Sequence, residues 1–287
     1  MSFRTVMISN TSKLNYKNRY LVVKQETDEK YVHLSEIDTL IIDSISVSIS
    51  SYLLKEIIDN KINIIFCDEK HNPHSELISL HNSHNSTKKV LEQINWKNKD
   101  LLWKSIVINK IINQSMVLNY NSKDKYDLLL TYTNEVKIGD KSNREGHAAK
   151  VYFNSLFGNE FKRNNNDNIN DALNYGYAVL LSTVSKEIVS LGYLTQLGIH
   201  HKNEFNDYNL SCDLMEVFRP IIDDFVYRHK TDEFNKEYRL KLLNLFNDKC
   251  KYNNKFYTIK DIIKFYVKDT LSILDGNKIY SNFIYEK

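Results

Sequence analysis

Two acidic residues follow a pair of histidines within the stretch 198–220. His200 and His201 stand in a polar segment, and Asp213 and Glu216 lie about one turn into the next segment with helical periodicity. Imidazole and carboxylate groups on either side of a loop–helix junction are ligands that divalent metal ions accept, and such ions catalyse phosphoester chemistry. The stretch therefore suggests a metal-dependent phosphoester site, although its spacing alone is not specific.

The helical periodicity places Glu216 away from the apolar face. Asp213 and Glu216 are three residues apart and share one side of a helix, and the apolar residues centre on the opposite side: Leu214, Val217, Phe218, Ile221 and Phe225. Periodicity alone thus predicts a solvated Glu216. Pro220 has no N–H for the carbonyl of residue 216, so we also expect a distorted helix turn beside Glu216, as is common at functional sites.

The two histidines are expected to lie in a connection rather than on a helix face. Gly198 follows a long helical pattern over 170–196 and is predicted to end that helix. His200 and His201 are then free to reach a ligand. The residues themselves do not decide which of the two does so.

A third carboxylate, Glu145, lies far upstream near the start of another predicted helix. Ser142 or Asn143 can cap that helix, and Ala149, Tyr152 and Leu156 fall on the same face as Glu145. A carboxylate on an apolar face is costly unless it is paired or binds a cation. The alternative is that Glu145 only stabilises the helix N-terminus through the macrodipole. Position alone favours neither interpretation.

Composition limits the class of protein. The chain has 287 residues, 42% of them hydrophobic, with only seven glycines and two prolines, which favours one large or two ordinary globular domains. The three cysteines are widely scattered, which predicts reduced thiols in a cytoplasmic protein. No apolar run approaches the roughly 20 residues of a membrane span, so the sequence predicts no membrane association.

The net charge of +3 is too small to indicate a nucleic-acid-binding protein by itself. Residues 84–110 nevertheless contain six lysines (88, 89, 97, 99, 104 and 110) beside Trp96 and Trp103. Such a strip is compatible with binding a phosphate backbone, and equally with an ordinary solvated helix face. A row formed by Lys260, Lys264 and Lys268 is better explained as a solvated face.

The elements predicted from periodicity divide the chain into two parts. The first 80 residues read as short strands at 4–8, 20–24, 31–34, 39–42, 45–49 and 62–67, with a short helix capped by Ser50 or Ser51. A polar, histidine-rich stretch at 73–87 reads as the linker, and helical patterns follow at 88–120, 143–158, 170–196, 210–229, 232–247 and 258–274. We therefore expect an α+β protein with a small β-rich N-terminal domain (1–80) and a larger all-α C-terminal domain (81–287).

Three ordered motifs resemble one family. They are Asn143 to Phe153 (NREGHAAKVYF), Gly198 to His201 (GIHH) and Asp213 to Pro220 (DLMEVFRP). Together they are similar to the CRISPR-associated endonuclease/integrase of spacer acquisition. Matches at 170–177 and 12–18 extend the resemblance over essentially the whole chain, and the 13–18 and 203–206 segments look like the branch found in type II systems.

The resemblance implies a metal-dependent DNA integrase that joins protospacer DNA to a CRISPR repeat by transesterification. Its glutamate, histidine and acidic ligands map onto Glu145, His201 and Glu216, with Mg²⁺ or Mn²⁺ as the cofactor. His201 is selected because the family motif places its histidine three residues after the glycine, and Asp213 matches a nearby acid that supports or replaces a ligand. Implied partners are double-stranded DNA, a second copy in a homodimer paired through the β-rich domain, a small ferredoxin-like adaptation protein and the type II effector nuclease. Two other classes stay open, namely a stand-alone metal-dependent nuclease and a non-catalytic DNA-binding scaffold.

Overall fold

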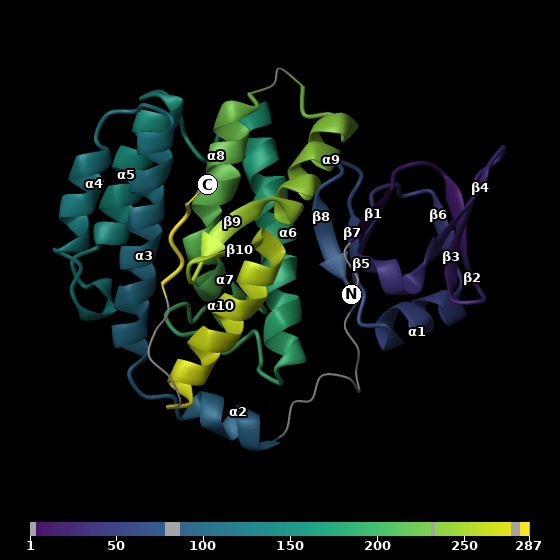
Figure 1. Ribbon diagram of the computed structural model, residues 1–287, viewed down its shortest axis with the longest axis horizontal. Coiled ribbons are helices and arrows are strands. Elements are labelled where there is room, and N and C mark those ends of the chain that lie inside the picture. Colours follow the sequence, from purple (N-terminus) through teal and green to yellow (C-terminus); the bar gives the residue numbers. More distant parts are fainter. Residues whose placement is uncertain (1–3, 78–86, 231–232, 277–281, 287) are drawn as a thin grey trace. The chain divides into compact units, whose positions relative to one another are not determined.

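The computed structural model describes residues 4–77, 87–230, 233–276 and 282–286, which fall into two compact units (Figure 1). Unit 1 comprises Met1–Ser83 and Asn235–Asn244, and unit 2 comprises His84–Phe234 and Leu245–Lys287. The short segment 235–244 thus groups with the N-terminal residues although it lies far along the chain. The division into domains at residue 80, with a dimerising N-terminal domain, stays a prediction.

Unit 1 contains two four-stranded sheets. The first has the order β1 (Arg4–Ile8), β5 (Ile37–Ile42), β7 (Asn63–Cys67) and β8 (Pro73–Glu76), in which β8 is antiparallel to β7 and the other neighbours are parallel. The second has the order β4 (Glu29–His33), β3 (Tyr20–Lys24), β2 (Ser12–Lys17) and β6 (Val47–Ile49). A short 3-10 turn, η1 (Leu34–Glu36), leads from β4 into β5.

The core of unit 1 lies between its sheets and α1 (Ser51–Asp59). Leu14 and Leu21 from the second sheet, Leu40 and Ile64 from the first, and Leu53 of α1 are all fully buried in one cluster. Ser50 caps α1, since its hydroxyl accepts the N–H of Leu53 at 3.3 Å, as predicted. Helix α9 (Lys236–Asn244) also belongs to this unit, where Arg239 pairs with the buried Asp43 at 3.1 Å.

All six predicted strands are confirmed within two residues, but two further strands of unit 1 were missed. Strand β2 has the polar sequence SKLNYK and was not recognised as a strand. Strand β8 starts at Pro73, inside the segment predicted to be a linker, and pairs only with β7 at the edge of its sheet. Proline is tolerated at the first residue of an edge strand, where no ladder N–H is required. Residues 78–86, the rest of that predicted linker, lie outside the described residues.

Unit 2 is mainly helical. Its helices are α2 (Thr87–Ile94), α3 (Lys99–Tyr120), α4 (Tyr126–Thr133), α5 (Arg144–Phe157), α6 (Asn168–Ser190), α7 (Asn209–Met215), α8 (Arg219–Arg228) and α10 (Ile259–Leu274). The 3-10 turn η2 (Ile138–Asp140) lies between α4 and α5, η3 (Glu216–Phe218) lies between α7 and α8, and η4 (Leu245–Asn247) follows α9. The single helix predicted at 88–120 is broken between α2 and α3, and α4 was not predicted.

Helix α3 positions the other elements of unit 2. It packs against α4 and α5 on one side and against η3 and α8 on another, and Figure 1 shows it running between these two groups. Buried Asn113 of α3 donates to the carbonyls of Val217 and Phe283 at 2.8 and 3.0 Å and accepts the N–H of Tyr285 at 2.9 Å. One side chain therefore fixes α3, η3 and the C-terminal segment to one another.

The C-terminal part contains a β-hairpin that periodicity did not reveal. Strands β9 (Lys249–Tyr252) and β10 (Lys255–Thr258) pair antiparallel through Asn253 and Asn254, whose φ angles are +49° and +63°. Two residues with positive φ form the tight turn that hairpins favour, and asparagine tolerates this conformation. The α+β class is confirmed, with a helical C-terminal region that carries this one hairpin in place of the expected all-α domain. No helix among the described residues is long and apolar enough to cross a membrane.

Candidate active site

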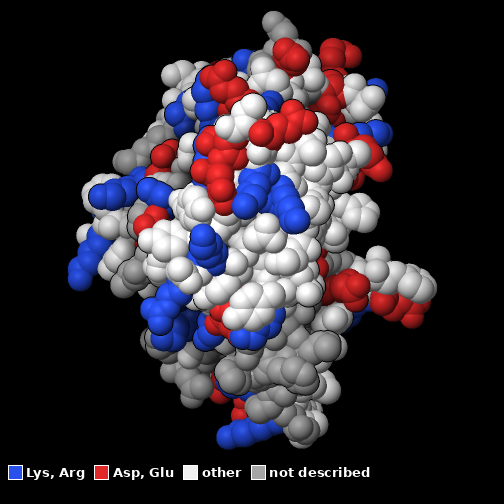
Figure 2. Space-filling view, turned by 90° about the vertical axis from the view of Figure 1, so that its right-hand side faces the viewer, with Lys and Arg blue, Asp and Glu red and all other residues white. Residues whose placement is uncertain are grey.

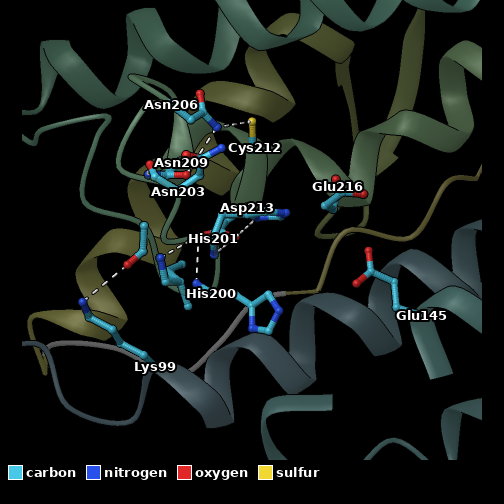
Figure 3. Close-up of polar contacts among 12 residues, drawn as sticks. Lys99, Glu145, His200, His201, Asn203, Asn206, Asn209, Cys212, Asp213 and Glu216 are labelled. Carbon is cyan, nitrogen blue, oxygen red and sulfur yellow. Dashed lines mark hydrogen bonds and ion pairs between the residues drawn. The ribbon is translucent and has the colours of Figure 1, made fainter. Parts of the chain in front are cut away.

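Glu145 and Glu216 approach each other from distant parts of the sequence. Glu145 is the second residue of α5 and Glu216 is the first residue of η3, and Figure 3 shows their carboxylates facing the same space. The ammonium of Lys110, on α3, lies 2.7 Å from Oε1 of Glu145 and 2.5 Å from Oε2 of Glu216. The structure therefore brings two of the three predicted ligands around a single positive charge.

Asp140 fixes the start of α5 and thereby the position of Glu145. Its two carboxylate oxygens accept the N–H groups of Arg144 at 2.9 Å and Glu145 at 3.0 Å. Asn143 occupies the N-cap position with a φ of +51° but makes no side-chain cap bond, so the predicted cap by Ser142 or Asn143 is replaced by Asp140. The predicted apolar face is confirmed by the fully buried Tyr152 and the 1% exposed Leu156.

Glu216 is buried, with only 4% of its surface exposed, so the prediction of a solvated Glu216 is wrong. The helical wheel assumed that only one side of the segment faces the core, but α3 packs against α7, η3 and α8, and α6 packs against α7 and α8. The predicted distortion next to Pro220 is confirmed, because residues 216–218 form the 3-10 turn η3 between two α-helices. This turn directs Glu216 toward Lys110 instead of toward water.

The charges around Glu216 compensate for its burial. Burial raises the pKa of the Glu216 carboxyl, but Lys110 and Arg219 outweigh this effect, so its pKa lies below its ordinary value. Burial likewise opposes the charged form of Lys110, yet Glu216 and Glu145 hold the pKa of that ammonium above its ordinary value. The carboxylate of Glu216 is therefore ionised at neutral pH, as a metal ligand must be.

Asp213 organises the turn that carries His201 (Figure 3). Its fully buried carboxylate accepts the backbone N–H groups of Ile199 at 2.6 Å, His200 at 3.0 Å and His201 at 3.2 Å. The same carboxylate lies 2.6 Å from Nδ1 of His201. This hydrogen bond is the main cause of the raised pKa of the His201 imidazole.

Gly198 is required by this turn, and it does not end the preceding helix as predicted. Helix α6 stops at Ser190, and Gly192, with a φ of +87°, follows it in the left-handed conformation typical of helix ends. A Cβ atom on Gly198 would lie 2.4 Å from the carbonyl oxygen of His201 and 2.8 Å from Oδ2 of Asp213. Only glycine allows the chain to close so tightly around the carboxylate.

The two histidines have different surroundings. The ring of His200 stacks in parallel on the buried Trp103 with a centroid distance of 4.3 Å. The ring of His201 meets Trp103 edge-on at 5.8 Å and keeps its Nδ1 on Asp213. His201 therefore has Nε2 available for a ligand, whereas His200 covers an aromatic surface beside it.

A divalent ion fits the chemistry of these side chains. Two carboxylates already converge on one cation, and a histidine oriented through Nδ1 by a carboxylate is the usual arrangement of a metal-binding imidazole. Among the residues that the structure describes, however, no three His, Cys, Asp or Glu side chains converge closely enough to surround an ion. Of the three predicted ligands, Glu145 and Glu216 therefore lie together around Lys110, and His201 lies on the neighbouring turn.

Sequence reasoning missed Lys110 because it was counted within the basic strip 88–110. In the structure Lys110 is 9% exposed, and Lys89 is paired with Asp275 at 2.6 Å, so the strip is not one continuous surface. A signal was present in the sequence. Lys110 lies at helical spacing from Trp103, Ile106 and Val107, which are all buried. A lysine on such a stripe indicates a buried ionic partner.

Arg219 connects the acidic pair to a buried polar network. Its Nε lies 3.0 Å from Oε1 of Glu216, and its guanidinium lies 4.7 Å from the ring centre of Tyr177. The Tyr177 hydroxyl donates in turn to Asp223, and burial raises the pKa of that carboxyl to about 6. The Glu216 carboxylate is therefore held by cations on two sides.

A basic cavity adjoins the start of α5. Its volume is about 760 Å³, and it is lined by residues that include Lys104, Lys137, Lys141 and Arg144. Arg144 pairs there with Glu135 at 2.8 Å. The remaining positive charge suits an anionic ligand such as a phosphodiester backbone.

The chain is similar to proteins of one family. The model of the family described as CRISPR associated protein Cas1 matches residues 6–238. A CRISPR-associated endonuclease Cas1 from Neisseria meningitidis is 35% identical over 226 residues, which cover 78% of this chain and 74% of that protein.

Solved structures show the same fold. A CAS1 protein from Thermotoga maritima superimposes with a TM-score of 0.80 at 18% identity, covering 98% of this chain and all of that one. A casposase bound to its integration product gives 0.77 at 19% identity, covering 98% and 93%. A chain of a Cas6-RT-Cas1–Cas2 complex gives 0.73 at 17% identity, covering 99% of this chain and 36% of that one.

Proposed function

Because the chain belongs to the Cas1 family of CRISPR-associated endonucleases, we propose that Glu145, His201 and Glu216 form the metal centre of a spacer-integrating enzyme. The chain is an endonuclease that integrates spacers in CRISPR adaptation. The observation that supports this metal centre is the convergence of Glu145 and Glu216 on one cationic position, at 2.7 and 2.5 Å from the same ammonium.

Each residue has a distinct role in the proposed centre. Glu145 and Glu216 supply carboxylate oxygens and His201 supplies Nε2, while Asp213 orients the imidazole through Nδ1. When bound, a divalent ion stabilises negative charge on the attacking, leaving and non-bridging oxygens of a phosphodiester. Two carboxylates suit Mg²⁺, and the imidazole shifts the preference toward Mn²⁺.

The proposed reaction is a transesterification on DNA. The 3′-hydroxyl oxygen of the protospacer forms a new bond to a phosphorus atom at the repeat boundary, and the bond from that phosphorus to the original 3′-oxygen breaks. The attacking hydroxyl loses its proton, and the departing 3′-oxygen gains one. One phosphodiester replaces another, so no nucleotide fuel is needed. The cations that line the cavity beside α5, Lys104, Lys137 and Lys141, are placed to hold the DNA backbone.

The excess positive charge of the chain lies in unit 2. Unit 1 contains twelve Lys and Arg and twelve Asp and Glu, so the net charge of +3 belongs to unit 2. Figure 2 shows one face of the molecule, on which side chains of both signs are interspersed with uncharged surface. That face presents no continuous basic field of the kind that a phosphate backbone attracts.

The proposed partners follow from the family. We propose a homodimer that pairs through the β-rich N-terminal residues and that binds protospacer and repeat DNA together with a small ferredoxin-like adaptation protein. The 13–18 and 203–206 segments favour the type II-like branch, in which the effector nuclease joins the complex. Structures similar to this chain include a casposase bound to its integration product and a Cas1–Cas2 complex, which supports DNA and a Cas2-like protein as partners.

A half-site integration assay tests the proposed centre. The purified chain is incubated with a labelled protospacer, the small partner protein and a plasmid that carries the repeat, in Mg²⁺ or Mn²⁺. Glu145→Ala and Glu216→Ala should abolish joining, and the matched control Glu160→Ala, which changes an exposed carboxylate, should join normally. Circular dichroism checks that each variant is folded.

The outcomes separate the candidate functions. Normal joining by a folded Glu145 or Glu216 variant would show that the centre is elsewhere. Metal-dependent cleavage without joined product would instead indicate a stand-alone nuclease. Binding of DNA with neither cleavage nor joining, in either metal, would indicate a scaffold.

A further inference from the structure

The ammonium of Lys110 lies between the carboxylates of Glu145 and Glu216, which are two of the proposed metal ligands. We propose that Lys110 is a displaceable internal cation, which holds the two carboxylates together in the metal-free protein and must leave them when a metal ion binds. The inference rests on the proposed metal centre. In it, Lys110 competes with the metal ion for the two carboxylates and so lowers the affinity for metal.

Because the carboxylates of Glu145 and Glu216 are poorly solvated, the metal-free protein needs a cation between them. The side chains of Lys110 and Glu216 are only 11% and 6% exposed, and that of Glu145 is 26% exposed. Two carboxylates that share one poorly solvated space repel each other unless a cation lies between them. Lys110 contacts both, so the protein stays folded around the acidic pair without a metal ion.

The departure of Lys110 would halve the excess positive charge that a bound divalent ion brings to the site. Lys110 and Arg219 together neutralise Glu145 and Glu216, because the four groups carry two positive and two negative charges. Adding a divalent ion without moving either cation would place two uncompensated positive charges in the same space. Arg219 is held by Glu216 and the Tyr177 ring, whereas Lys110 reaches the pair on a flexible four-carbon stem. Lys110 is therefore the group that moves.

Metal binding to Lys110 variants tests this proposal directly. Mn²⁺ affinity is measured by calorimetry on the full chain without DNA, for the wild type, Lys110→Met and Lys110→Arg. Removal of the competing charge in Lys110→Met should strengthen Mn²⁺ binding about tenfold, and Lys110→Arg should bind no more tightly than the wild type. Lys264→Met, an exposed change of the same type on α10, should leave the affinity unchanged.

A second measurement uses the unmodified protein, so it does not depend on variants that fold. Reductive methylation followed by mass spectrometry reports how accessible each lysine is. Labelling of Lys110 should be slow in EDTA and at least about threefold faster in saturating Mn²⁺, because the displaced ammonium gains solvent. Labelling of Lys264 should be equal in both conditions.

The results distinguish failure of this inference from failure of the metal centre. If Mn²⁺ binds the wild type and Glu145→Gln removes that binding, the centre stands. Equal or weaker Mn²⁺ binding by Lys110→Met, or unchanged Lys110 labelling, then overturns the displacement. If the wild type and Lys110→Met both bind no Mn²⁺, or if Glu145→Gln binds it normally, the proposed centre itself is wrong and the inference falls with it.

Discussion

The imidazole of His201 and the carboxylate of Asp213 lie 2.6 Å apart, and the same carboxylate accepts three backbone N–H groups from the turn 199–201. Asp213 therefore fixes both the path of the chain and the orientation of the ring. Asp213 makes these four hydrogen bonds within one turn, which makes it a residue that positions His201 rather than a direct ligand.

Asp213→Asn should weaken Mn²⁺ binding by about 10- to 100-fold while the protein stays folded. The amide keeps the shape of the side chain but loses the charge that orients the imidazole through Nδ1. Calorimetry with Mn²⁺ measures the effect, and the exposed Asp207→Asn serves as the control. An unchanged affinity for Asp213→Asn would show that this hydrogen bond does not prepare His201 for a metal ion.

The ion pair between Lys110 and Glu216 should show strong coupling in a double-mutant cycle. Glu216→Gln leaves the buried Lys110 without one of its two carboxylates, and we expect it to lower the free energy of unfolding by about 3 kcal/mol in EDTA. The double variant with Lys110→Met should lose less than the sum of the two single changes, by at least about 1 kcal/mol. Urea denaturation measures all four proteins. Additive losses would mean that the two groups do not stabilise each other.

Local patterns in the sequence predicted where helices and strands lie better than they predicted which residues the fold buries. Short runs between polar turns identified β1 and β3, alternation identified β6, and Ser50 was one of two serines recognised as a helix cap, because these features depend on neighbouring residues. Pro220 predicted the distorted turn for the same reason. Burial of Glu216 could not be predicted from one helix, since it depends on α3 packing against η3 and on α6 packing against the flanking helices α7 and α8.

The arrangement of the candidate site depends on contacts between distant residues. Glu145 was placed on the correct helix face, but its partner Lys110 was assigned to a surface strip, because lysines were counted without regard to helical phase. The role of Gly198 was missed because the close approach of Asp213 is a tertiary contact. A motif therefore identified the candidate residues, and the fold was needed to show how they are held.

Gly198→Ala should disrupt the turn that carries His201. The new methyl group would lie 2.4 Å from the backbone carbonyl oxygen of His201, which cannot move without breaking the bonds to Asp213. We expect a loss of stability of about 2 kcal/mol and weaker Mn²⁺ binding. Thermal unfolding and calorimetry measure the two effects. Gly158→Ala is a useful control, because a Cβ atom there meets no atom within 4 Å, although its φ of +105° adds local strain. Unchanged Mn²⁺ binding by Gly198→Ala would show that the turn can relax.

The buried Asp223 should make the protein less stable as the pH rises through 6. Its pKa is raised from 3.8 to about 6, chiefly by burial, so the folded state favours the protonated carboxyl. The stabilising contribution is complete below about pH 3.8 and is lost as the pH rises through 6, a change of about 3 kcal/mol for a shift of roughly two units.

Asp223→Asn tests this contribution because the amide stays uncharged at every pH. Relative to the wild type, the variant should gain about 2–3 kcal/mol of unfolding free energy between pH 4.5 and pH 8. Urea denaturation across this range measures the difference, and Asp207→Asn, at an exposed position, should show no such gain. The Tyr177 hydroxyl can still donate to the amide oxygen, so packing around Arg219 should persist. A difference that does not change with pH would mean that Asp223 ionises normally in the folded protein.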